Sequence, residues 1–210
     1  MRCNNLSAID ADLWVFDNDG TLYRDTRPIE NVVESFMIDF IARYYGLNRE
    51  QATTKRREIL RKYRTSYTLI AMRNEGVDED EFIRATYLKV NPSDYGISDS
   101  PDLRNILLSC KGERIVLTNN VSEFANAILC SLGIRDLFSS IVGMRERNFA
   151  QKPDTSAFGF VQSALRVGRS VAFLDDGIEN IKTTKQLGCV TILVKNRELT
   201  EYADFRVQLS

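Results

Sequence analysis

Short apolar runs alternate along the chain with longer segments in which apolar residues recur every three or four positions. Continuous apolar runs rich in β-branched and aromatic residues are typical of parallel strands covered on both faces. The pattern predicts strands at 13–16, 115–117, 171–174 and 190–194, and weaker ones at 141–142 and 205–207. It predicts helices at 121–132, 155–167 and 178–187. This alternation from residue 114 onward predicts an α/β fold with a doubly wound parallel sheet.

A long helical insertion interrupts the alternation after the first strand. It holds no convincing strand, and its apolar spacing predicts helices at 29–45, 49–62, 66–75 and 79–89. We interpret residues 28–96 as a helical cap domain, inserted into a core domain made of 1–27 and 97–210. A basic run at 55–64 is interpreted as a solvated helix face, with an anion-attracting rim as the alternative.

Composition and charge exclude several classes of partner. The chain has 210 residues, 43% of them hydrophobic, which suits a globular domain with a modest insertion. Lysine and arginine total 28 against 29 acidic residues, so no global positive charge attracts a nucleic-acid polymer or an anionic membrane. No apolar run approaches the ~18 residues of a membrane span, and no signal peptide is readable. We expect a cytoplasmic protein, a monomer or a homodimer.

Histidine is absent from the sequence. This excludes Ser-His-Asp and Cys-His catalysis as well as zinc held by histidine. The four cysteines lie far apart and form no C-x-x-C pair, so we expect reduced, mostly buried thiols rather than disulfides: Cys3, Cys110, Cys130 and Cys189. Chemistry must then use carboxylates, lysine, hydroxyls, thiols or a metal held by carboxylates, and we expect no catalytic cysteine because none adjoins a base or a motif.

Polar clusters follow the predicted strands, at the edge of the sheet where α/β proteins bind ligands. The first pairs two carboxylates, Asp17 and Asp19, which can bind a hard cation and also perform nucleophilic or acid–base work. The others are Thr118-Asn119, Lys152-Pro153 and Asp175-Asp176. Each has a structural alternative as a helix cap, a surface charge or a loop. Their common position and order favour one shared site.

These four clusters resemble the motifs of the haloacid dehalogenase superfamily, in the order in which that family has them. The family has D-x-D-G-T, a Thr or Ser after the second strand, a Lys, and a D-D or G-D pair. The resemblance covers essentially the whole chain. It implies a Rossmann-like core, an inserted helical cap, and a Mg²⁺-dependent mechanism through an aspartyl-phosphate.

The resemblance also implies a role for each residue of the motifs. Asp17 matches the nucleophile and Asp19 the general acid, which must be protonated when the leaving oxygen departs. Lys152 matches the cation that supports Asp17 and binds phosphate, and Asn180 matches a polar residue supporting the last motif. The implied phosphate contacts are Lys152, Thr118 and the N–H groups of Asn18 and Asn119. The implied metal ligands are Asp17, the Asp19 carbonyl, Asp176 directly and Asp175 through water.

Asp19 favours phosphoryl chemistry, because dehalogenases of this superfamily lack a second aspartate there. A phosphonatase would need a cap lysine that forms an imine, and the charged surroundings of Lys55, Lys62 and Lys89 give no sign of one. A narrower resemblance is to the pyrimidine 5′-nucleotidase-like branch, through Tyr23, residues 63–69 and residues 76–82. That branch has an apolar residue at the position of Asn18, often Asn at the position of Gly20, and Y-G-T where this chain has Tyr63-Arg64-Thr65.

We therefore expect a Mg²⁺-dependent phosphomonoesterase whose leading substrate is a nucleoside 5′-monophosphate, with pyrimidines favoured. Candidate substrate contacts are Tyr23, Tyr63, Arg64 and Tyr67, because aromatic rings can stack on a base; packing is the alternative for each tyrosine. A phosphosugar or broad small-metabolite phosphatase is the alternative within enzymes, ahead of a phosphoryl-returning mutase. A non-catalytic regulator that binds a phosphorylated ligand is the alternative of another class.

Overall fold

A computed structural model describes residues 6–194 and the backbone of 205–207. The chain divides into two compact units. The α/β unit comprises Met1–Thr26 and Gly96–Ser210, and the helical unit comprises Arg27–Tyr95.

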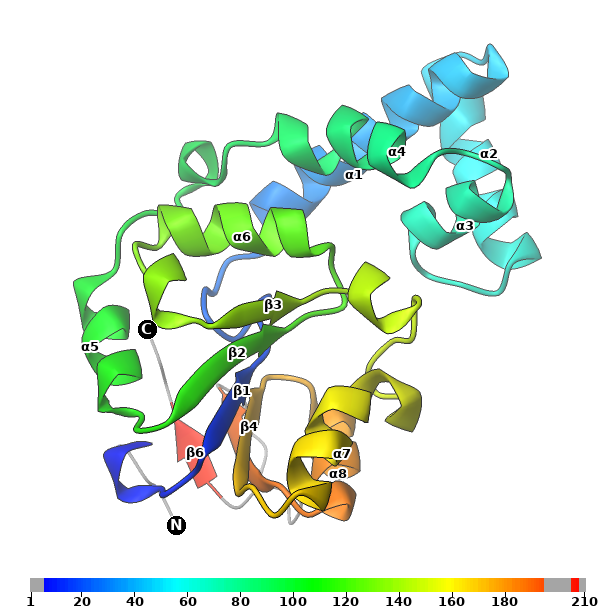
Figure 1. Cartoon of the computed structure of the whole chain (residues 1–210). Helices are drawn as coiled ribbons and strands as arrows, with labels where there is room; N and C mark the ends of the chain where they lie inside the picture. Colours follow the sequence, from blue (N-terminus) through cyan, green and yellow to red (C-terminus); the bar gives the residue numbers. More distant parts are fainter. Residues whose placement is uncertain (1–5, 195–204, 208–210) are drawn as a thin grey trace. The chain divides into compact units, whose positions relative to one another are not determined.

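The α/β unit is built on a six-stranded parallel sheet with the order β3-β2-β1-β4-β5-β6 (Figure 1). The strands are β1 (Leu13–Phe16), β2 (Glu113–Leu117), β3 (Ser140–Val142), β4 (Val171–Asp175), β5 (Val190–Val194) and β6 (Phe205–Val207). The predicted α/β fold is confirmed, including both of the weaker strands. Non-consecutive neighbours such as β1 and β4 require crossover connections, which the helices supply.

The central strand β1 is fully buried, and its side chains alternate between the two faces of the sheet. Leu13 and Val15 join a core cluster with residues of two helices on one face. Trp14 and Phe16 face the other side, where the ring of Phe16 meets that of Phe138 edge-on at 5.7 Å. Burial on both faces explains why this strand is a continuous apolar run.

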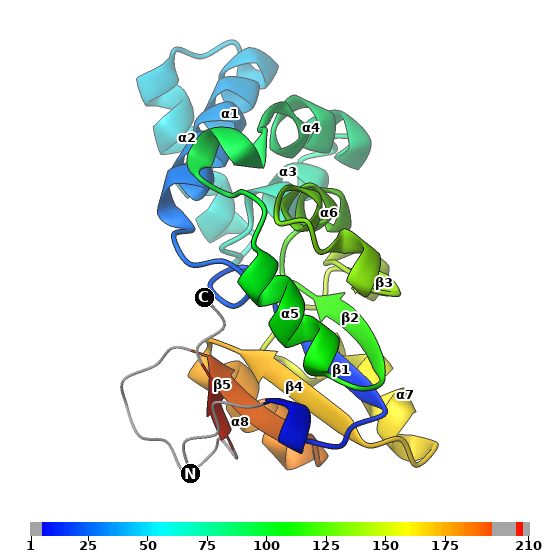
Figure 2. The same cartoon turned by 90° about the vertical axis from the view of Figure 1, so that its left-hand side faces the viewer.

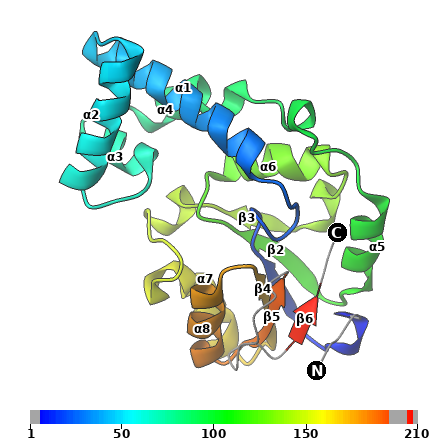
Figure 3. The same ribbon diagram turned by 180° about the vertical axis from the view of Figure 1, so that it is seen from behind.

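Helices cover both faces of the sheet. The helices α5 (Pro101–Ser109) and α6 (Ser122–Ser131) lie on one face, and α7 (Gly159–Arg166) and α8 (Ile178–Leu187) on the other (Figures 1, 2 and 3). The helix expected over 155–167 begins as a 3₁₀ turn, Thr155–Phe158, and becomes α-helical at Gly159. Other 3₁₀ turns of this unit are Leu6–Ala8, Arg135–Leu137 and Arg145–Arg147.

The register of the sheet brings the predicted motifs together. Phe16 pairs with Val116 on one side and with Leu174 on the other. The next residue of each strand is therefore level with Asp17, and the Asp17 N–H donates to the Leu174 carbonyl at 2.9 Å. The carboxyl ends of three adjacent strands thus meet at one edge of the sheet.

The helical unit contains α1 (Arg27–Tyr45), α2 (Arg49–Lys62), α3 (Thr68–Asn74) and α4 (Glu79–Ala85), followed by 3₁₀ turns at Tyr87–Lys89 and Pro92–Tyr95. Asn48 and Gln51 form a capping box at the start of α2, and Asp78 caps α4. The prediction of one helix over 79–89 is wrong beyond Ala85. Thr86 leaves the helical region at φ −126° and ψ −85°, while its hydroxyl donates to the Phe82 carbonyl at 2.7 Å.

Cys110, Cys130 and Cys189 are free thiols; the first and last are buried and Cys130 is exposed, whereas Cys3 lies outside the described residues. Within the described part of the chain, no helix has both the length and the apolar character that crossing a bilayer requires.

Candidate functional site

A buried ion triad lies at the carboxyl ends of β1 and β4. The Lys152 Nζ donates to Asp17 Oδ1 and to Asp175 Oδ2, each at 2.7 Å. All three side chains are almost fully enclosed, since the exposed fraction is 2% for Lys152, 9% for Asp17 and 1% for Asp175. Burying charged groups this deeply is costly unless they are paired and hydrogen-bonded.

The electrostatics of the triad favour a cation beside Asp17. Burial would lower the pKa of Lys152, but the carboxylates of Asp17 and Asp175 outweigh burial and raise it to about 12. Burial raises the pKa of Asp17 to about 8, an effect that the charge of Lys152 opposes and the charges of Asp175 and Asp19 reinforce. Lys152 is therefore protonated at neutral pH, whereas full ionisation of Asp17 requires further positive charge next to it.

A cluster of three carboxylates could supply that charge by binding a metal ion. Oxygen atoms of Asp17, Asp175 and Asp176 lie within 4.8 Å of one another. Asp175 already accepts hydrogen bonds from Lys152, from the Gly177 N–H at 2.7 Å and from the Asn180 amide at 2.9 Å. Its oxygens are thus largely committed to the protein, whereas Asp176 is exposed. An all-oxygen donor set of this kind fits a hard cation such as Mg²⁺.

Gly20 lies directly against Asp176. A Cβ atom at Gly20 would come within 2.3 Å of Asp176 Oδ2, and the backbone there has φ +82°. Glycine adopts this conformation without strain and leaves room for the carboxylate. The position where the nucleotidase-like branch often has Asn is therefore occupied here by a residue that accommodates Asp176.

The two oxygens of Asp19 have different partners. The Tyr23 hydroxyl donates to Oδ1 at 2.5 Å. The Thr118 hydroxyl and the Asn120 side-chain amide face Oδ2 at 3.3 and 3.4 Å. The Asp19 side chain is thus held by a residue of its own loop, after β1, and by two residues of the loop after β2.

Asn119 connects the loop after β2 to Lys152. Its Oδ1 accepts from the Lys152 N–H at 2.8 Å, and its Nδ2 donates to the Lys152 carbonyl at 2.9 Å. The guanidinium of Arg147 donates to the Thr118 carbonyl at 2.5 Å and to the Gly143 carbonyl at 3.0 Å. Arg147 was not predicted as a site residue, because it follows β3 without any motif around it. Asn120 was not predicted either, although it stands in the polar cluster directly after Asn119.

The structure brings the motif residues of the α/β unit together: Asp17, Asn18, Asp19, Thr118, Asn119, Lys152, Asp175, Asp176 and Asn180, with Tyr23 beside Asp19. The other substrate candidates belong to the helical unit. The Tyr63 hydroxyl donates to Glu75 Oε1 at 2.8 Å, Tyr67 is half-buried, and Arg64 is exposed with a left-handed φ of 49°. Glu75 also accepts from Lys62 and Tyr45, so Tyr63 takes part in an ion-pair network within this unit.

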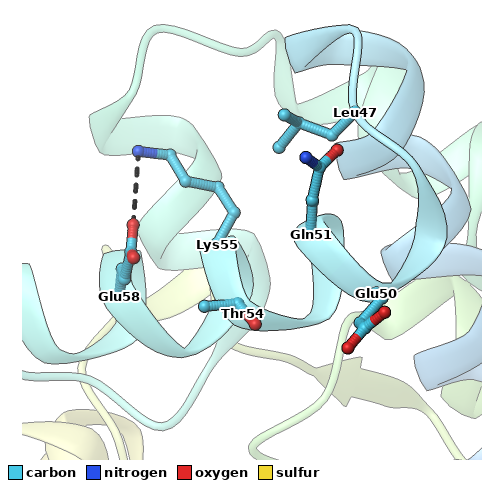
Figure 4. Close-up of a pocket in the computed structure, with 6 residues that line it drawn as sticks. All are labelled: Leu47, Glu50, Gln51, Thr54, Lys55 and Glu58. Atoms are coloured by element: carbon cyan, nitrogen blue, oxygen red, sulfur yellow. Dashed lines mark ion pairs between the residues drawn. The ribbon is translucent and has the colours of Figure 1, made fainter.

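A hollow of about 390 Å³ on the helical unit has a different character from the aspartate site. It is lined by Leu47 and one side of α2: Glu50, Gln51, Thr54, Lys55 and Glu58 (Figure 4). Its one lysine lies 3.8 Å from Glu58. Because its acidic residues outnumber its cation, this hollow is a poor receptor for a phosphate group.

Several known proteins are similar to this chain in sequence or in fold. "Phosphate metabolism protein 8" of Saccharomyces cerevisiae (strain ATCC 204508 / S288c) is 24% identical in a match that covers 84% of this chain. The chain spans only 59% of the length of that curated relative. The crystal structure of a HAD phosphatase from Thermococcus onnurineus superposes with a TM-score of 0.62 at 18% identity, covering 94% of each chain.

Fold similarity alone does not separate phosphatases from dehalogenases. A 2-haloacid dehalogenase from Pseudomonas syringae pv. Tomato DC3000 has a TM-score of 0.55 at 18% identity, covering 95% of each chain. The family model of the haloacid dehalogenase-like hydrolases matches residues 11–188, which hold β1 to β4 and every motif described above. The chain therefore belongs to the haloacid dehalogenase-like hydrolases.

Proposed function

We propose that the protein is a Mg²⁺-dependent phosphomonoesterase that works through a phosphorylated Asp17. The observation that carries the proposal is the contact of buried Lys152 with Asp17, next to a second carboxylate, Asp19, that reaches Thr118. A haloacid dehalogenase needs no acid for its leaving halide. The leaving group of a phosphate ester is an alkoxide, which needs a proton.

Two steps describe the reaction. In the first, an oxygen of Asp17 bonds to phosphorus as the bond from phosphorus to the ester oxygen breaks, and Asp19 gives its proton to that oxygen. In the second, Asp19 takes a proton from water while the water oxygen attacks phosphorus and the bond to Asp17 breaks. The products are an alcohol and inorganic phosphate, and both aspartates return to their starting states.

The chain's own residues prepare these steps. Lys152 holds Asp17 in one orientation and supplies positive charge near the phosphoryl group. Asp17, Asp176 and the Asp19 carbonyl would hold Mg²⁺ directly, with Asp175 acting through water. Bound Mg²⁺ would keep Asp17 ionised and neutralise charge on the phosphoryl oxygens. The Thr118 hydroxyl and the N–H groups of Asn18 and Asn119 would bind those oxygens.

For the substrate we propose a nucleoside 5′-monophosphate, with pyrimidines favoured, and the helical unit as the cap that reads it. Resemblance to the nucleotidase-like branch around Tyr23 and Tyr63 supports this choice. Tyr63, Arg64 and Tyr67 are the candidates for contact with the base, and the Tyr63 hydroxyl also binds Glu75 within the unit. A phosphosugar or another small phosphorylated metabolite is the alternative substrate class.

The test is a phosphate-release screen of the purified protein with Mg²⁺ across nucleotides and sugar phosphates. Asp17→Asn should abolish release, and Asp102→Asn, which changes an exposed carboxylate of α5, should not. Acid quenching of the wild-type reaction with a labelled substrate should trap label on the protein. If the wild type instead binds a phosphorylated ligand and does not hydrolyse it, the result would favour the non-catalytic regulator.

A further inference from the structure

The side chain of Tyr23 is buried, with 5% of its surface exposed, and its hydroxyl donates to Asp19 Oδ1. The backbones of Asp19 and Tyr23 also form an isolated β-bridge, which fixes the loop between them. We propose that Tyr23 is a positioning residue that orients the Asp19 carboxyl for proton transfer. This inference rests on the proposed phosphatase function and gives Tyr23 a role other than stacking on a base.

The two oxygens of the Asp19 carboxyl differ in the groups that hold them. Oδ1 is held by Tyr23, while Oδ2 faces Thr118 and Asn120, which belong to the loop expected to bind phosphate. A phenol hydroxyl can donate to Oδ1 whether or not Oδ2 carries a proton. Tyr23 therefore keeps Oδ2 directed at the reacting groups in both protonation states. The proton leaves Oδ2 for the ester oxygen in the first step and returns to Oδ2 from water in the second.

The burial of Tyr23 favours a positioning role over stacking on a base. A ring that stacks on a base must expose a face, and the side chain of Tyr23 exposes almost none. Thr118 and Asn120 contact Oδ2 at 3.3 Å or more, so the Tyr23 contact at 2.5 Å is the shortest side-chain hydrogen bond described for this carboxyl. Removing the hydroxyl alone should free the carboxyl to rotate while the ring stays packed.

The experiment compares Tyr23→Phe with Tyr87→Phe, a matched control because Tyr87 is also 5% exposed but lies in the helical unit. The substrates are an aryl phosphate, whose leaving group needs little protonation, and an alkyl phosphate, whose leaving group needs it fully. Tyr23→Phe should lower kcat/KM for the alkyl ester by about tenfold, a fraction of the 10²–10⁴-fold of acid catalysis. It should change the value for the aryl ester by less than about twofold, and Tyr87→Phe should leave both unchanged.

A double-mutant cycle with Asp19→Asn shows whether Tyr23 acts through Asp19. Tyr23→Phe should cause no further loss on the alkyl ester once Asp19 is replaced. Equal losses on both esters, or a full additional loss in the Asp19→Asn background, would overturn the positioning role. That outcome is distinct from failure of the proposed function, in which Asp17→Asn would retain turnover or Asp19→Asn would affect both esters equally.

Discussion

The side chain of Asn119 hydrogen-bonds both the N–H and the C=O of Lys152, at 2.8 and 2.9 Å. These two bonds fix the Lys152 backbone relative to the end of β2, and the Lys152 side chain then reaches Asp17 and Asp175. Asn119 therefore has two separate roles in the proposed site. Its backbone N–H is a candidate phosphate donor, while its amide orients the lysine.

Asn119→Ala should separate these two roles, because alanine keeps the backbone N–H and lacks the side-chain amide. Leaving the Lys152 peptide unpaired should lower the free energy of unfolding by about 1–3 kcal/mol. A shifted ammonium should also lower kcat/KM by about tenfold or more. Urea unfolding and phosphate release measure the two effects. The control is Asn126→Ala, at an exposed asparagine of α6, which should keep the turnover of the wild type. Unchanged turnover in Asn119→Ala would show that Asn119 does not position Lys152.

Gly20→Ala should weaken metal binding, because the added methyl group would press on the Asp176 carboxylate. The matched control is Gly168→Ala, since Gly168 has nearly the same φ, +84°, with nothing within 4 Å of an added Cβ. Both variants should lose about 1–2 kcal/mol of stability through backbone strain. Only Gly20→Ala should raise the Mg²⁺ concentration that gives half-maximal activity. Equal Mg²⁺ requirements in the two variants would show that Asp176 is not a ligand.

Asn18→Leu should stabilise the protein. Asn18 is fully buried, and among the described residues neither polar atom of its amide has a hydrogen-bond partner. Burying an unpaired amide costs about 1–3 kcal/mol, and leucine has the same branched outline without polar atoms. We expect a gain of about 1 kcal/mol in urea unfolding and little change in turnover, because the proposed phosphate donor at this position is the backbone N–H. A loss of stability would indicate that the amide binds an internal water molecule.

The pH dependence of the helical unit should reflect Glu75. Hydrogen bonds from Lys62, Tyr45 and Tyr63 lower the pKa of Glu75 to about 2, below its ordinary value of 4.5. A depressed pKa contributes stability above about pH 4.5, and this contribution is lost as the pH falls towards 2. Glu75→Gln should therefore be less stable than the wild type at pH 7, and the difference should shrink between pH 4.5 and 2. A constant difference across this range would mean that the ionised form of Glu75 is not favoured.

Metal removal should abolish activity and lower the melting temperature. Excess EDTA should stop phosphate release and Mg²⁺ should restore it, whereas Ca²⁺ should bind without supporting turnover because its geometry is looser. Mg²⁺ should also raise the melting temperature of the wild type, since it neutralises three neighbouring carboxylates in the folded state. Asp176→Asn should reduce that increase. Full activity in EDTA would contradict the proposed chemistry.

The sequence predicted the sheet and the clustered motifs because each depends on local patterns. A strand buried on both faces, such as β1, is apolar at every position, and its carboxyl end lies at the ligand-binding edge whatever the rest of the chain does. The contact of Tyr23 with Asp19 and the role of Arg147 could not be predicted. Both depend on how loops approach one another, and Arg147 lies beside Asn148 and Phe149, two non-glycine residues with positive φ that no sequence pattern indicated.

The position of β1 has a consequence for how the protein is made. β1 lies between β2 and β4, and Lys152 binds Asp17 across 135 positions of sequence. During synthesis β1 emerges before β4, its second neighbour, which follows after the whole helical unit and β2 and β3. Until β4 is complete, one edge of an entirely apolar strand remains open to pairing with other chains, a state that favours aggregation. A nascent chain can thus assemble its candidate catalytic centre only after Asp175 has left the ribosome, and a chaperone that shields β1 until then should increase the yield of folded protein.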